Sequence, residues 1–212
     1  MTPEDFAEAL VDDLAPVRPA IGWMRALLTW TSLAWVFVSV LVLATGPLRE
    51  GAIATLAITP RYTLEFALAV LGGLAAIAAG LELGVPGHPG TIRLLLPSVA
   101  LLLGWLALLG YGLLDPVIET GMLGKRALCS YQTFAFALPP LALALYALRQ
   151  RALFARTATG VLVGIGAAAI PAAWMQLACL YDPLHSLLFH LIPVALAGGL
   201  GGLAAHWILP RH

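Results

Sequence analysis

Long runs of apolar residues dominate the chain from about residue 20 onward. Six such segments occur, at about 22 to 46, 62 to 85, 92 to 113, 131 to 149, 157 to 180 and 184 to 208. A helix needs roughly 20 apolar residues to cross a hydrocarbon core, and each segment except the fourth approaches or exceeds that length. The fourth is shorter and contains Pro139 and Pro140, but omitting it would conflict with the distribution of charge. The pattern predicts an all-α, polytopic membrane protein with a six-transmembrane-helix bundle.

Residues 1–19 differ from the rest because they carry five acids and no long apolar run. A capping-box pattern at the start and Pro16 at the end predict a short helix between them. On this helix Phe6, Leu10 and Leu14 recur every four residues and form one narrow apolar stripe, with acids on the other faces. Anionic lipid headgroups would repel this acidic helix. Its apolar stripe and acidic faces are better suited to a groove with a basic rim on a protein partner. A solvated tail before the first span is the alternative.

Composition agrees with membrane insertion. Hydrophobic residues make up 61% of the chain and charged residues 10%, and the mean hydropathy is +0.94, which is too apolar for a water-soluble domain of this length. We therefore expect membrane lipid to surround residues 20–212. The net charge is zero, so the totals do not indicate a nucleic-acid partner, and we expect no direct contact with nucleic acid.

Basic residues set the expected orientation. With the N-terminus in the cytoplasm, seven basic residues face inward and four face outward, in agreement with the positive-inside rule. Both termini are then cytoplasmic, and three hairpins open outward. The inward set is Arg18, Arg25, Arg93, Arg149, Arg151, Arg156 and Arg211, and the outward set is Arg49, Arg61, Lys125 and Arg126.

The junction of the last two segments carries the candidate chemistry. It gathers a thiol, a carboxylate and two imidazoles in apolar surroundings, where polar groups cost free energy unless they are paired, ligated or hydrated. Asp182 and Pro183 are explained as the N-cap and first residue of a helix. Cys179, His185 and His190 have no such explanation.

The predicted topology puts Cys129 and Cys179 at the same outer face, with His185 in the first turn of the last span. His190 lies about 10 Å deeper at roughly 1.5 Å per residue, and in a regular helix it points well over a right angle away from His185. Thiolate with imidazole favours Zn²⁺, Cu⁺ or Cd²⁺, whereas two thiols at an oxidising face favour a disulfide. Two separate buried thiols are the alternative. We predict sensing by Cys129, Cys179, His185 and His190, and binding of Zn²⁺ or another soft metal ion by Cys129, Cys179 and His185.

The chain resembles the NrsF-like integral membrane anti-sigma factors, bacterial inner-membrane proteins that hold an extracytoplasmic-function sigma factor inactive. The resemblance rests on the stretch Ala9–Arg18, on one cysteine before the fourth span and another closing the fifth, and on the run from Cys179 to His190. It implies that residues 1–19 bind the sigma factor and that both cysteines take part in signal perception. A role for His190 is our own inference. The expected sigma-binding residues are Phe6, Leu10, Asp12, Asp13, Leu14, Pro16, Val17 and Arg18.

These patterns divide the chain into a cytoplasmic sigma-binding segment, 1–19, and a transmembrane sensor domain, 20–212, without enzymatic activity. A small transporter or metal-export component is the main alternative. It requires charges within the membrane along a pathway, but Glu65 and Glu82 lie near the ends of the second span and are expected to reach the interfaces. A thiol oxidoreductase requires a further cysteine pair or a quinone site to pass electrons on.

Overall fold

The computed structural model describes Thr2, residues 22–83, 91–116, Arg126, and residues 128–149, 155–179 and 181–209. Within these ranges the regular structure is helical and no strand occurs. Residues 3–21 lie outside the described part of the chain. The short N-terminal helix and the expected sigma-binding residues Phe6, Leu10, Asp12, Asp13, Leu14, Pro16, Val17 and Arg18 all fall there.

Six helices are long and apolar enough to cross a membrane, which confirms the predicted spans, including the fourth. They are α2 (Trp23–Ala44), α4 (Pro60–Leu83), α5 (Thr91–Leu114), α6 (Cys129–Leu148), α7 (Arg156–Ala178) and a composite helix over Pro183–Ile208. The composite helix consists of α8 (Pro183–Ser186), the π-helical turn η1 (Leu187–Leu191) and α9 (Ile192–Ile208). A short helix, α3 (Ala52–Ile58), follows α2 and was not predicted, because seven residues are too few for the length criterion of a span.

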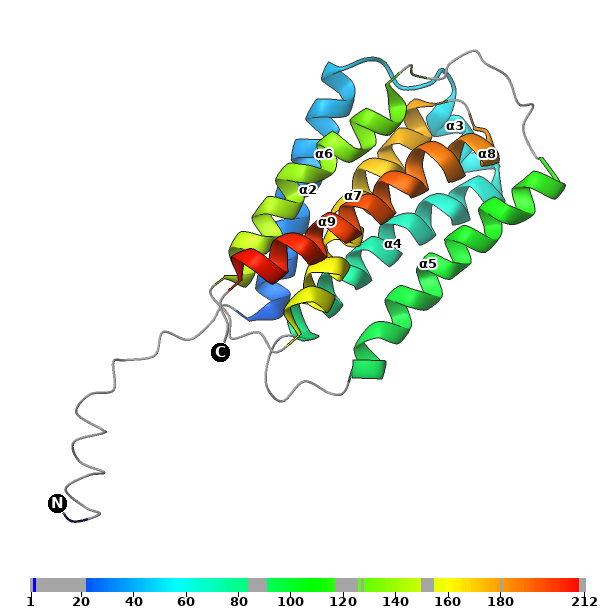
Figure 1. Ribbon diagram of the computed structural model, residues 1–212. Helices are drawn as coiled ribbons and strands as arrows, with labels where there is room; N and C mark the ends of the chain where they lie inside the picture. The colour runs from blue at the N-terminus through cyan, green and yellow to red at the C-terminus, as the bar shows by residue number, and fades with distance from the viewer. Residues whose placement is uncertain are drawn as a thin grey trace.

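The spans lie side by side and successive spans run in opposite directions (Figure 1). Helix α7 is the most enclosed, and α9, α4, α6 and α2 pack around it. Helix α5 lies at one edge of the bundle and packs mainly on α4. One end of the bundle therefore holds the end of α7 and the starts of α4, α6 and α8. The other end holds the start of α2 at Trp23 and the end of α9 at Ile208.

The closest helix pair is α7 with α9, which meet through glycines. A Cβ atom on Gly160 would collide with the carbonyl oxygen of Gly201, and one on Gly164 would collide with the carbonyl oxygen of Ala197. Backbones approach this closely only where side chains are absent, and such contacts hold helices together in lipid by van der Waals packing. Two small residues four positions apart, as in Gly160-x-x-x-Gly164, predict such a close approach from the sequence alone, and this stretch is an interhelical contact in the structure.

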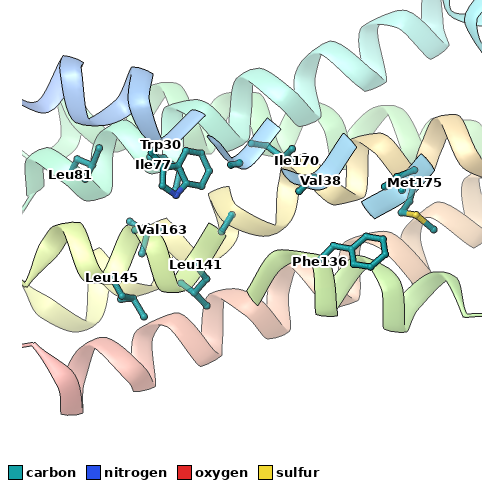
Figure 2. Close-up of a cluster of buried hydrophobic side chains, with 14 of the residues drawn as sticks. Trp30, Val38, Ile77, Leu81, Phe136, Leu141, Leu145, Val163, Ile170 and Met175 are labelled. Carbon is teal, nitrogen blue, oxygen red and sulfur yellow. The ribbon is translucent and has the colours of Figure 1, made fainter. Parts of the chain in front are cut away.

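Larger side chains fill the spaces between the other helices. Figure 2 shows one cluster in which Trp30 and Val38 of α2 face Ile77 of α4, Leu141 of α6 and Ile170 of α7. The Trp30 indole N–H also donates to the carbonyl of Pro140 at 2.8 Å, which joins α2 to α6. Many leucines and isoleucines on the outer faces are exposed, as expected for surfaces that contact lipid.

Candidate functional site

Three helix ends meet at the candidate site. Cys129 is the first residue of α6, and Cys179 directly follows α7. Asp182 begins the last span as predicted, because its Oδ1 accepts hydrogen bonds from the backbone N–H groups of Leu184 at 3.1 Å and His185 at 3.3 Å. This cap satisfies N–H groups that have no partner within the helix and fixes the direction in which α8 begins.

The four predicted sensing residues come together in one cluster. Cys129 Sγ lies 3.0 Å from Cys179 Sγ and 2.9 Å from His190 Nε2. The two sulfurs and one ring nitrogen each of His185 and His190 all lie within 4.8 Å of one another. All four side chains are buried, with exposed fractions between 0% and 7%. The two thiols are neighbours and are not separate buried groups.

The expectation that His185 and His190 diverge is wrong, because their ring centroids lie 5.2 Å apart with the planes at 84°. In a regular α-helix five residues leave the two side chains about 140° apart. The π-helical turn η1 takes up one extra residue, so five positions act as roughly four α-helical ones and both rings fall on one side. Pro193 favours this irregular turn because it has no N–H to donate to the carbonyl of Phe189.

Ring packing holds the imidazoles in place. His185 stacks on Phe189 with ring centroids 4.9 Å apart and planes at 28°. Among the described residues, Nε2 of His185 and Nδ1 of His190 are buried without a hydrogen-bond partner. A buried polar atom left in this state costs free energy. On His190 the nitrogen that faces Cys129 is the other one, Nε2.

The surroundings of Cys179 lower the pKa of its thiol. The hydrogen bond from the Cys129 thiol lowers the pKa of the Cys179 thiol, and contacts with His185 and His190 act in the same direction against the effect of burial. A thiolate is the form that binds metal ions and attacks sulfur. The residues present therefore fit a soft or borderline metal ion, and two adjacent sulfurs also fit a disulfide.

Glu65 belongs to a second polar group, which lies beside this cluster. The expectation that its side chain reaches an interface is wrong, because the side chain is fully buried. Its Oε1 accepts hydrogen bonds from the Tyr181 hydroxyl at 2.6 Å and from Arg61 Nε at 3.2 Å. The Tyr62 hydroxyl donates to the carbonyl of Gln176 at 2.6 Å. These bonds fasten α4 to the end of α7 and to the connector that precedes α8.

Arg126 joins the start of α6 to the end of α2. Its guanidinium donates to the carbonyls of Val42, Gly46 and Pro47 at distances between 2.7 and 3.3 Å. The Arg126 carbonyl accepts a hydrogen bond from the N–H of Cys129 at 3.2 Å. Carbonyls at a helix C-terminus have no partners within the helix, and a cation there also interacts favourably with the helix dipole.

Sequence reasoning missed these supporting residues. The spacing of Arg61 and Glu65, four positions apart, was the one available signal, because it places both on one helix face. The partners of Tyr181 and Arg126 come from remote parts of the chain, and no local pattern indicates them.

In a comparison with known families, residues 10–210 match the family described as negative regulator of sigma F. Comparisons with curated proteins and with solved structures found no match. The matched range includes every described span and the cluster of two thiols and two imidazoles. The chain belongs to the NrsF family of negative regulators of sigma F.

Proposed function

We propose that the protein is an anti-sigma factor of the bacterial inner membrane that holds an extracytoplasmic-function sigma factor inactive through residues 1–19. Family membership supports a regulatory role with a sigma factor as partner. The acidic, amphipathic pattern of residues 1–19 supports binding in a basic groove, since sigma surfaces that engage polymerase and promoter DNA are rich in basic residues. The distribution of basic residues supports cytoplasmic N- and C-termini.

The signal acts at Cys129, Cys179, His185 and His190, which face the opposite side of the membrane. One observation supports this proposal. The N-terminal segment joins the bundle near Trp23, and the four residues converge at the opposite end of the bundle. Helix α2 has 22 residues and is therefore about 33 Å long, so the two regions lie roughly one membrane thickness apart.

Two signals fit the cluster, and they exclude each other because both use the same sulfurs. Hydrogen peroxide oxidises the pair when a bond forms between the sulfurs of Cys129 and Cys179, both thiols lose their hydrogens, and the peroxide is reduced to two molecules of water. A divalent metal ion instead displaces the two thiol protons. Either event changes the 3.0 Å separation between the sulfurs and hence the relative position of the ends of α6 and α7.

Helix α7 offers a route to the other end of the bundle. Its backbone contacts α9 through Gly160 and Gly164, and Arg156 at its far end donates to the carbonyls of His206 and Leu209, both at 3.0 Å. A shift of the end of α7 is therefore passed to the side that carries residues 1–19. Release of the sigma factor requires the signal to favour one conformation by a few kcal/mol.

Co-purification tests the sigma-binding part. The full chain should retain a sigma factor, and residues 20–212 should retain none. Equal recovery with both chains would remove the claim.

The sensor part is tested with Cys129→Ser and Cys179→Ser in the full chain. Both should still bind the sigma factor and should no longer release it on exposure to peroxide or to a soft metal ion. Normal release from both variants would exclude the thiols as the sensor.

A further inference from the structure

His190 completes a four-residue set that sequence spacing had ruled out. We propose that Cys129, Cys179, His185 and His190 together bind one divalent ion of the Zn²⁺ or Cd²⁺ class in a closed tetrahedral site, and that the π-helical turn η1 builds this site. The inference deepens the proposed function, since it names the ligands of a metal signal. Metal binding can still be measured without a sigma factor.

The distances in the cluster match a small tetrahedral site. Zn²⁺ binds thiolate sulfur at about 2.3 Å and imidazole nitrogen at about 2.0–2.1 Å, so the ligand atoms of a tetrahedron lie roughly 3.3–3.8 Å from one another. The four ligand atoms here lie within 4.8 Å of one another, and two of the pairs are 3.0 and 2.9 Å apart. Binding requires the sulfurs to separate by about 0.8 Å, which a side-chain torsion supplies.

Ligand chemistry selects the class of ion. Two sulfurs and two imidazole nitrogens favour Zn²⁺ and softer ions and disfavour Mg²⁺, Ca²⁺ and Mn²⁺, which prefer oxygen. The nearest carboxylate along the chain, Asp182, already accepts two backbone hydrogen bonds as the N-cap of α8. Four protein ligands leave no open position for a substrate, so the site is suited to regulation and not to catalysis.

Both histidines lie where they can serve as ligands. His185 and His190 are 7% and 1% exposed, and Nε2 of His185 is buried without a hydrogen-bond partner in the described ranges. Nε2 of His190 lies 2.9 Å from Cys129 Sγ, and a bound ion would replace this contact. Stacking on Phe189 restricts the first ring, and the contact with Cys129 restricts the second. Ligands held in advance in this way lose little conformational entropy when an ion binds.

The π-helical turn is the structural requirement for the site. Without it, two ligands five positions apart would point about 140° from each other, and at most one could reach the sulfurs. With it, the rings lie 5.2 Å apart beside both thiols. Such turns are rare in proteins, and those that occur often lie at functional sites. Positioning both histidines beside the thiols is the role that we assign to this one.

Titration with Co²⁺ tests the site in the reduced, full-length protein purified in detergent. One equivalent of Co²⁺ should give intense tetrahedral d–d bands with sulfur-to-metal charge transfer, and Zn²⁺ or Cd²⁺ should abolish both by displacement. His185→Ala and His190→Ala should each weaken Co²⁺ binding at least about tenfold and alter the bands. The matched control is His206→Ala, an exposed histidine on α9 at the other end, which should leave the titration unchanged.

His190→Cys separates loss of a ligand from loss of the fold. This variant keeps four ligands, so it should remain tetrahedral and increase the charge-transfer intensity by about half as two Co–S bonds become three. Full affinity and unchanged bands in both histidine-to-alanine variants would overturn the proposal. Octahedral bands, or no binding to the reduced wild-type protein, would overturn it as well. A protein that binds Co²⁺ as expected but does not release a sigma factor would refute the proposed function alone.

Discussion

Replacing Tyr181 with Phe isolates the hydrogen bond that holds the thiol-bearing connector against α4. The substitution removes only the hydroxyl, which donates to Glu65 Oε1 at 2.6 Å, and keeps the aromatic ring that packs edge-on against Tyr62 at 5.0 Å. Burial raises the pKa of Tyr181, and the hydrogen bond to Glu65 acts in the same direction, so the hydroxyl is protonated and acts as the donor.

The expected loss of stability in Tyr181→Phe follows from the few hydrogen-bond partners that Glu65 has. Its Oε2 is buried without a partner within the described ranges, and its Oε1 would retain only Arg61 at 3.2 Å. A hydrogen bond to a charged group contributes about 1.5–3 kcal/mol, and its loss at a buried carboxylate lies at the upper end. For a chain of this size each kcal/mol shifts the thermal midpoint by roughly 2–4 °C, so we expect a decrease on the order of 5–10 °C.

Thermal unfolding in detergent, followed by circular dichroism, measures this decrease. The matched control is Tyr131→Phe, which removes the same hydroxyl from a side chain that is 69% exposed on α6 and should shift the midpoint by less than about 1 °C. The double variant with Glu65→Gln should cost less than the sum of the two single variants, because the two groups interact. Equal thermal midpoints for Tyr181→Phe and Tyr131→Phe would show that the hydrogen bond from Tyr181 to Glu65 does not stabilise the fold.

Two further predictions concern the frame around the site. Gly164→Leu should destabilise or unfold the bundle, by about 3 kcal/mol or more, because its side chain would enter the backbone of Ala197. A Cβ atom on Gly199 of α9 would meet nothing within 4 Å, so Gly199→Leu should retain the wild-type thermal midpoint, and an equal loss in both variants would contradict the proposed packing. Arg126→Gln should lower stability by about 1–3 kcal/mol through loss of its bonds to the end of α2. Arg25→Gln, which changes an exposed arginine, is its control, and the two should be compared by the same unfolding assay.

Sequence alone determined the class of protein and the number of spans. Apolar runs of about 20 residues permit few structures in lipid, because every backbone N–H and carbonyl there needs a partner within a helix. The N-cap at Asp182 and the Gly160-x-x-x-Gly164 contact were also predicted from local sequence, since both depend on a few neighbouring residues. Family resemblance pointed to the same membership that the match over residues 10–210 established.

Tertiary structure alone decided which polar groups meet. A periodicity of 3.6 residues placed His190 away from His185, and only the π-helical turn, which depends on how the last span packs and on Pro193, brings the two rings together. Glu65 looked like an interfacial acid because its partner Tyr181 lies 116 positions away in sequence. Hydrophobic pattern reports how far each residue lies from water, but it carries no information on contacts between remote helix ends, and those contacts form the candidate site.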